Sequence, residues 1–299
     1  MKRISAQNTI KIQIEHSKVK IPHETVGVDI GQSLTKIAYS KGNEIILMMA
    51  PTSSNYTKTK QFIEENKKQY KTINFTGGKA YILYKKYSNE FETNLINEFE
   101  ANMGGVEFLY EYNKNKPMPS TIVVTIGTGT SIMLKTDVIK HLGGSALGGG
   151  FFMGLINLLF QEDFTNYSEA IRYASHGDRY HIDLKVGDIY NDEDNRVDKL
   201  FREFTAATLG KVDRDIDVKS VERNDIIASL IGSIGENIGT IATLMAENNE
   251  VKQIIFCGGF LIGNKLLKQI LALVCKIKRI KPVFLENSVF AGAIGALKF

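Results

Sequence analysis

The feature that most constrains the fold of this chain is a strand–turn–strand unit that occurs twice and has glycine in both turns. The first unit joins apolar strands predicted at 26–29 and 33–39 through a turn that contains Gly31. The second joins strands predicted at 122–126 and 131–134 through Gly127 and Gly129. Glycine supplies the backbone freedom that such tight turns require. Because the second unit follows the first after about a hundred residues, the sequence predicts two related lobes.

Further strands and helices are predicted around each unit. In the first half, strands are predicted at 44–50 and 73–75 and helices at 56–71 and 94–112. In the second half, helices are predicted at 149–159, 167–175, 197–209, 225–247 and 291–297 and from residue 264, with strands at 254–257 and 283–285. Residues 177–196 are polar and predict a loop. We therefore expect an N-terminal extension at 1–24, a first lobe at 25–118 and a second lobe at 119–299.

Size and composition exclude several classes of protein. The 299 residues are 43% hydrophobic, which is enough apolar material for two packed lobes. The 37 basic and 33 acidic residues give a net charge of +4. Because the basic residues are dispersed along the chain, no nucleic-acid partner is expected, although the positive balance favours anionic ligands. Cys257 and Cys275 are too few for a disulfide framework and lie in apolar runs, which is typical of a reducing cytosol.

The N-terminal segment carries no signal that we can assign to chemistry. It has a weak apolar alternation at Ile10, Ile12 and Ile14 but no long apolar core of a signal peptide. An extra edge strand or a loosely held arm is expected there. No apolar stretch reaches the roughly 18 to 20 residues that span a bilayer, so no membrane partner and a cytoplasmic location are expected.

The first glycine turn carries groups suited to a phosphate. Asp29 ends the preceding apolar strand and predicts an anchor for a metal ion, held through water. The backbone amides of Gly31, Gln32 and Ser33 can cradle phosphate oxygens, and Lys36 on the returning strand can neutralise their charge. A plain glycine turn without a ligand is the alternative when this hairpin is considered alone.

The second glycine turn offers a comparable cradle. Gly127 and Gly129 let backbone amides approach anionic oxygens closely, and Thr128 adds a hydroxyl group. The P-loop pattern is absent, and no G-x-G-x-x-G sequence follows a strand and opens a helix. Nucleotide binding is therefore expected to use both turns together, with one polyphosphate held between them.

Two further glycine pairs have a binding interpretation, and the first of them also has a packing one. Gly149 and Gly150 open a predicted helix, whose N-terminus is a favourable anion site; close packing of that helix on a strand is the alternative. Gly258 and Gly259 follow a predicted strand and leave room for a flat adenine ring. For the small-residue helix at 291–297, tight packing on a sheet is the favoured interpretation.

Acidic residues that can act as a base do not stand out by spacing alone. Glu98 and Glu100 flank Phe99, and Asp178, Arg179, Asp183 and Lys185 crowd the polar segment. A kinase that acts on an alcohol needs one carboxylate near the attacking hydroxyl group, while positioning and electrostatics do most of the remaining work.

Several ordered strings nevertheless match a known pattern. The most specific runs from His176 to Tyr190. The others are TGG at 76–78, EFEA at 98–101, GTGTS at 127–131, LGGG at 147–150, TAA at 205–207 and AGAIGAL at 291–297. Together they resemble the type II pantothenate kinases, members of the acetate kinase/sugar kinase/Hsp70/actin superfold, over about residues 26–299.

The resemblance implies a fold and a reaction. The fold would be α/β, with two RNase H-like lobes whose mixed sheets are flanked by helices. The reaction would be ATP-dependent phosphorylation of pantothenate to 4′-phosphopantothenate, the first step of coenzyme A biosynthesis. ATP and Mg²⁺ would be the cofactors. The partners would be pantothenate and a second copy of the chain, which contacts the second lobe, with CoA or an acyl-CoA as a candidate inhibitor.

The resemblance also implies roles for single residues. Glu98 would be the general base on the pantothenate hydroxyl group, in the first lobe. Thr128 and Ser131 would contact the substrate, whereas Asp29 and Lys36 would serve Mg²⁺ and the phosphates. The adenosine site would lie in the second lobe.

Three positions depart from the family pattern. His141 stands where an arginine is expected to hold the substrate, and histidine lacks the two-pronged guanidinium group. Gln32 adds a side chain to the first phosphate turn, and Thr125 replaces an asparagine in the second hairpin. Two alternatives therefore stay open: a catalytically weak protein that binds ATP or an acyl-CoA, and a kinase for another small hydroxy acid or sugar.

Overall fold

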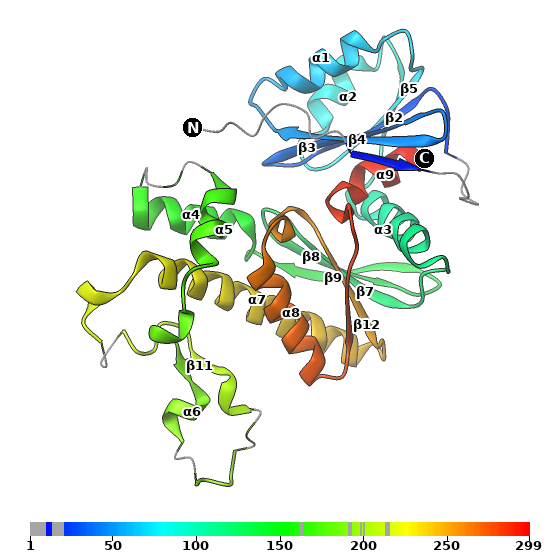
Figure 1. Ribbon diagram of the computed structural model, residues 1–299. Coiled ribbons are helices and arrows are strands. Elements are labelled where there is room, and N and C mark those ends of the chain that lie inside the picture. Colours follow the sequence, from blue (N-terminus) through cyan, green and yellow to red (C-terminus); the bar gives the residue numbers. More distant parts are fainter. Residues whose placement is uncertain are drawn as a thin grey trace.

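The computed structural model describes residues 10–13, 21–161, 164, 166–190, 193–197, 199, 201–212 and 216–299. Figure 1 shows two lobes, each built on one mixed sheet with helices against it. A third, smaller part carries a two-stranded sheet, β10 (Leu184–Lys185) with β11 (Thr205–Ala207), and extends away from both lobes. The expected α/β class with mixed sheets and flanking helices is confirmed.

The first sheet has six strands in the order β1-β4-β3-β2-β5-β6. Their bounds are β1 Ile10–Gln13, β2 Thr25–Ile30, β3 Leu34–Lys41, β4 Glu44–Pro51, β5 Thr72–Thr76 and β6 Glu92–Leu95. Strands β1 to β4 pair antiparallel, whereas β5 and β6 run parallel to β2. Helices α1 (Thr57–Glu65) and α2 (Tyr81–Tyr87) bury their apolar side chains on one face of this sheet.

The second sheet repeats this plan with five strands in the order β13-β12-β7-β8-β9. Their bounds are β7 Thr121–Ile126, β8 Thr130–Lys135, β9 Ile139–Ser145, β12 Gln253–Cys257 and β13 Lys281–Phe284. Its outer face is covered by α4 (Gly149–Phe160), α5 (Tyr167–Ala174), α7 (Arg223–Asn248) and α8 (Lys265–Ile277). Because side chains alternate across a strand, Val123 and Met133 face the opposite side, towards α3 (Glu98–Lys114).

Helices α3 and α9 (Ala291–Lys298) lie against each other where the two lobes meet (Figure 1). A Cβ on Gly295 would lie 1.7 Å from the carbonyl oxygen of Ala101, so only glycine allows this approach. Gly27 of β2 is equally restricted, because its Cβ would lie 2.1 Å from the carbonyl oxygen of Ala293. The tight packing expected for 291–297 is thus present, but on the first sheet.

Most predicted elements are present, and the main errors have identifiable causes. The helix predicted at 197–209 is wrong: its described part holds the short 3₁₀ helix Phe201–Glu203 and strand β11. The loop predicted at 177–196 contains β10 and the one-turn helix α6 (Val186–Ile189). Strand β9 was missed because its seven residues include two glycines and few apolar side chains. In each case a short segment takes its structure from its neighbours rather than from its own pattern.

The N-terminal and membrane expectations have mixed outcomes. Residues Ile10–Gln13 form the expected edge strand, whereas 1–9 and 14–20 lie outside the described residues. Contrary to the expectation of no such stretch, α7 is long and apolar enough to cross a membrane by length and composition. Because 61% of that apolar window is buried inside the protein, it has the properties of a core helix.

Candidate functional site

The two predicted glycine turns lie next to each other. Ser33, between β2 and β3, has its Oγ atom 3.4 Å from Oγ1 of Thr128, between β7 and β8. The first turn is closed by the amide of Gly31, which donates to Leu34. The second is closed by the amide of Gly127, which donates to Gly129. The structure therefore brings together two backbone corners, one from each sheet.

Beside the first turn lies a buried ion pair. Asp29 and Lys36 are directly opposite in the β2–β3 ladder, and Lys36 Nζ lies 3.0 Å from Asp29 Oδ2. Their side chains are only 10% and 14% exposed. A Cβ on Gly77 would lie 2.6 Å from Asp29 Oδ1, and one on Gly292 would lie 2.8 Å from Oδ2. Glycines at the end of β5 and in α9 therefore leave the room that this carboxylate occupies.

The donor set around Asp29 fits Mg²⁺ of a nucleotide complex. Mg²⁺ usually keeps several waters and is held by one or two carboxylates together with substrate phosphates. In the described part of the chain, no group of three or more histidine, cysteine, aspartate or glutamate side chains is placed to hold a metal. Asp29, close to the turn that can receive phosphates, supplies one carboxylate and leaves the other positions to water and nucleotide.

Glu98 is the first residue of α3 and lies near this ion pair. Loss of hydration raises the pKa of its carboxyl group, the negative charge of Asp29 raises it further, and the positive charge of Lys36 opposes both effects. The start of the helix is capped by Asn97, whose Oδ1 accepts from the amide of Phe99 at 2.9 Å. A carboxylate with a raised pKa is a candidate general base.

Ser131 and His141 lie on the strands that follow the second turn. The Oγ atom of Ser131 is buried and has no hydrogen-bond partner among the described residues. The adjacent Thr125 forms a 3.2 Å contact with the thiol of Cys257. His141 of β9 stacks on Phe99 of α3, with ring centroids 4.4 Å apart. The sequence did not indicate this aromatic pair, which places His141 beside the residue that follows Glu98.

The two glycines that open α4 pack against the second turn. The amide of Gly149 donates to Gly127 at 2.8 Å, and the amide of Gly150 donates to Thr128 at 2.9 Å. Because both amides already have backbone partners, the packing interpretation is favoured, and the assignment of these glycines as phosphate ligands stays a prediction. A Cβ on Gly150 would lie 2.5 Å from the Thr128 side chain. These glycines hold the second turn in place.

The remaining predicted residues are close to the turns. Gly258 follows β12 with a φ of 106°, and its Cβ would lie 2.4 Å from the carbonyl oxygen of Ile126, just before the second turn. Gly259 lies near Leu34 of the first hairpin, since its Cβ would be 3.4 Å from Leu34 Cδ1. Gln32 is exposed at the tip of the first turn.

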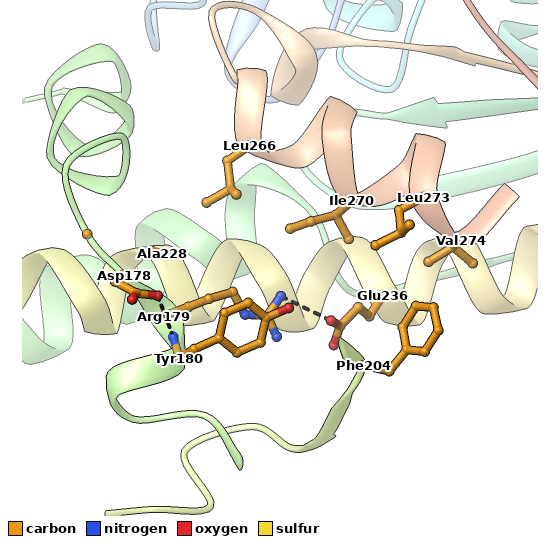
Figure 2. Close-up of a pocket in the computed structure, with 11 residues that line it drawn as sticks. Asp178, Arg179, Tyr180, Phe204, Ala228, Glu236, Leu266, Ile270, Leu273 and Val274 are labelled. Carbon is orange, nitrogen blue, oxygen red and sulfur yellow. Dashed lines mark hydrogen bonds and ion pairs between the residues drawn. The ribbon is translucent and has the colours of Figure 1, made fainter. Parts of the chain in front are cut away.

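The polar segment that follows α5 forms a separate buried cluster. Arg179 donates from Nε to Asp183 at 2.7 Å, and its Nη1 lies 3.0 Å from Glu236 of α7. This guanidinium group lines a cavity of about 220 Å³, and Figure 2 shows the side chains around that cavity. Side chains of α8, among them Leu266 and Ile270, line its other side. Asp178 and Arg179 thus attach this segment to α7, a role that the sequence favoured over ligand binding.

Both cysteines are buried and free, as expected. Cys257 lies in β12 and Cys275 in α8. Burial raises the pKa of the Cys257 thiol to about 11 and that of Cys275 to about 12. Neither thiol is therefore a nucleophile at neutral pH.

Comparison with solved structures supports the two-lobe fold. The chain is similar to the ethanolamine utilization protein EutJ from Carboxydothermus hydrogenoformans, with a TM-score of 0.54 and 12% identity over 95% of this chain and 92% of that one. It is also similar to a ROK family glucokinase from Streptomyces griseus, with a TM-score of 0.53 and 12% identity over 91% and 97%. At these identities the likeness concerns the fold alone.

Sequence comparison identifies the family. The family model named Fumble matches residues 48–298. A type II pantothenate kinase of Bacillus cereus strain G9842 is 32% identical over 274 residues, which cover 91% of this chain and 97% of that protein. Another, from Oceanobacillus iheyensis, is 34% identical over 278 residues, 91% of this chain and 98% of that protein. This chain therefore belongs to the Fumble family, the type II pantothenate kinases.

Proposed function

We propose that this protein is a kinase that transfers the terminal phosphoryl group of ATP to the hydroxyl group of pantothenate, the first step of coenzyme A biosynthesis. The relatives at 32% to 34% identity support the substrate, because they cover nearly the whole chain and carry that name. The observation that carries the proposal within the molecule is the 3.4 Å contact between Ser33 and Thr128. It brings together two phosphate-suited turns from two sheets.

The nucleotide would lie between these turns. Amides of Gln32 and Ser33 on one side, and of Thr128 and Gly129 on the other, are suited to phosphate oxygens, while the amide of Gly31 closes the first turn. Lys36 would neutralise phosphate charge, and the adenine would lie beside Gly258 and Gly259. Asp29 would hold Mg²⁺ through water, where the ion would neutralise charge on the transferred phosphoryl group.

Glu98 would accept the proton of the attacking hydroxyl group. A base with a raised pKa is a better proton acceptor while it is still ionised at neutral pH. The free hydroxyl group of Ser131 and that of Thr128 are suited to hold the substrate. Buried Ser131 Oγ supports this role, because a buried hydroxyl group without a partner is costly unless a ligand satisfies it. Closure of the lobes would exclude water from the reaction.

The test is formation of 4′-phosphopantothenate from pantothenate and MgATP by the purified protein. A panel of small hydroxy acids and sugars serves as the matched comparison. We expect the largest kcat/KM with pantothenate. A larger value with another acceptor would contradict the proposal and favour a kinase of different specificity.

A binding role without turnover is the second candidate, because His141 and Gln32 depart from the family pattern. Thermal unfolding with ATP, CoA and an acyl-CoA separates the two. A ligand at 100 times its Kd adds about 2.7 kcal/mol of stability. Stabilisation by these ligands without turnover of any acceptor would favour the binding role. If the protein does turn pantothenate over, a fall in that turnover as CoA is added would support CoA as an inhibitor.

Oligomeric state, location and lobe boundaries complete the proposal. We propose a homodimer formed through the second lobe, supported by exposed apolar side chains on α7 and α8 such as Leu244 and Leu273. Light scattering coupled to size-exclusion chromatography tests the dimer.

The free, buried cysteines support a cytoplasmic location. The division into an extension at 1–24 and lobes at 25–118 and 119–299 remains our proposal.

A further inference from the structure

We propose that His141 is a positioning residue: its ring stacks on Phe99 and thereby holds the first turn of α3, and with it Glu98, against the second lobe. The inference rests on the proposed kinase function, since it assigns a task in that reaction. The family resemblance predicts direct contact between residue 141 and the substrate. The stack points to action through Glu98 instead.

The geometry of the ring pair carries the inference. The two rings are 4.4 Å apart at their centroids and their planes differ by 20°, which is a stacked arrangement. Phe99 belongs to α3, the helix that follows the first sheet in the chain, and His141 belongs to β9, an edge strand of the second sheet. The contact therefore joins the two lobes. Phe99 is 37% exposed and His141 is also exposed. Phe99 lies outside the three apolar clusters of the described residues, so the stack with His141 helps to place its ring.

The backbone before Glu98 is fixed to the first lobe. The amide of Ile96 donates to the carbonyl oxygen of Phe75 in β5 at 2.8 Å. The hydroxyl group of Thr76 donates to the carbonyl oxygen of Ile96 at 3.0 Å. Glu98 thus stands between an anchor to the first sheet at Ile96 and an anchor to the second sheet at Phe99. Two anchors on opposite sides restrict the direction of the carboxylate more than either one does.

The strand β9 is shaped to present His141. In its ladder with β8, Gly143 pairs with Ile132 and His141 pairs with Met133, so Leu142 has no partner. Such a bulge redirects neighbouring side chains. Met133 belongs to the apolar cluster that contains α3 residues, and directly opposed residues share a face of the sheet. The register therefore directs His141 towards α3.

The consequence is a separation of effects that kinetics can measure. If His141 acts through Glu98, its loss slows the chemical step more than it weakens substrate binding. A planar ring without nitrogen atoms then restores the function, because it keeps the stack. If His141 instead contacts the substrate, its loss raises the KM for pantothenate and a phenyl ring restores nothing.

The kinetic test uses His141→Ala, His141→Phe and a control, Tyr112→Ala. Tyr112 lies near the other end of α3 and stacks on Phe108, with centroids 6.3 Å apart. We expect His141→Ala to lower kcat about tenfold and to change the KM for pantothenate less than about threefold. His141→Phe recovers most of that loss, and Tyr112→Ala leaves kcat unchanged. A His141→Phe enzyme as impaired as His141→Ala, or an effect confined to KM, overturns the inference.

A second measurement does not depend on activity. Denaturant unfolding of Phe99→Ala, His141→Ala and the double variant forms a mutant cycle. We expect the double variant to lose clearly less stability than the two single losses added together. If the two single losses in the free energy of unfolding simply add up to the loss of the double variant, the two rings do not stabilise each other and the inference is wrong. If the wild type does not phosphorylate pantothenate, the proposed function fails while this cycle still reports on the stack.

Discussion

Lys36 Nζ lies 3.0 Å from Asp29 Oδ2, and the two residues face each other across the β2–β3 ladder. Their opposite charges have opposite effects on the pKa of Glu98. The ion pair beside the first turn is thus coupled to the candidate base at the start of α3. Changes to any of these three residues should therefore alter the activity in related ways.

Removing the ionisable group of Glu98 should abolish most turnover while the fold is kept. Glu98→Gln retains the size of the side chain but cannot accept the proton, so we expect kcat to fall by about 10²–10⁴-fold. Glu100→Gln is the matched control, because Glu100 lies in the same exposed first turn. Product formation from pantothenate and MgATP measures both. Equal turnover of Glu98→Gln and wild type would remove Glu98 from the proposed role.

Much of this site could be predicted because its parts are local in sequence. A glycine turn between two apolar strands is visible in a dozen residues, and its recurrence indicated that Asp29 and Thr128 belong to one place. The role of Gly149 and Gly150 could not be decided, because only the structure shows that the carbonyl groups of the second turn accept from their amides.

Contacts between distant segments are the part that the sequence could not reveal. Phe99 and His141 carry no shared pattern, and their contact depends on how two lobes dock. Glu236, which pairs with Arg179, is one of many charged residues on a helix. The helix predicted at 197–209 is wrong for a related reason, because β11 forms through its pairing with β10, which lies elsewhere in the sequence.

The pH dependence of the reaction should follow the charges around Glu98. The base works when it is deprotonated, so kcat/KM should rise with pH through the pKa of Glu98, which lies above the usual value for glutamate. Lys36→Met removes the cation that lowers this pKa, so the rise should move to higher pH. Asp29→Asn removes the anion that raises it, so the rise should move to lower pH. A pH profile of each variant at saturating MgATP tests the signs, and shifts in the same direction would contradict the coupling.

The contact between α3 and α9 should tolerate no side chain at Gly295. In Gly295→Ala the new Cβ would meet the backbone oxygen of Ala101 at 1.7 Å, so the helices must separate. We expect a loss of about 3 kcal/mol in the free energy of unfolding. Gly154→Ala is the control: no atom lies within 4 Å of its Cβ, and alanine favours the helix by about 0.5–1 kcal/mol. Urea unfolding of both variants is the measurement, and a stable Gly295→Ala protein would show that the helices do not pack this closely.

The buried guanidinium group of Arg179 should be needed for stability. Asp183 is fully buried and accepts from Arg179, from the hydroxyl group of Ser229 at 2.6 Å and from the amide of Leu209 at 2.8 Å. In Arg179→Met the carboxylate of Asp183 keeps these two neutral donors but loses the cation that paired with it. We expect the free energy of unfolding to fall by about 3–5 kcal/mol.

The matched control for this variant is Arg196→Ala. Arg196 also pairs with an aspartate, Asp194, at 2.7 Å, but its side chain is 81% exposed. The Arg196 guanidinium group is in water, and Asp194, whose side chain is 17% exposed, keeps the hydrogen bond from the backbone amide of residue 196 in the variant, so a change within about 0.5 kcal/mol is expected. Thermal and urea unfolding compare the two variants. If Arg179→Met unfolds like the control, the attachment of residues 178–183 to α7 does not depend on the ion pair, and burial of the surrounding apolar side chains alone must hold it.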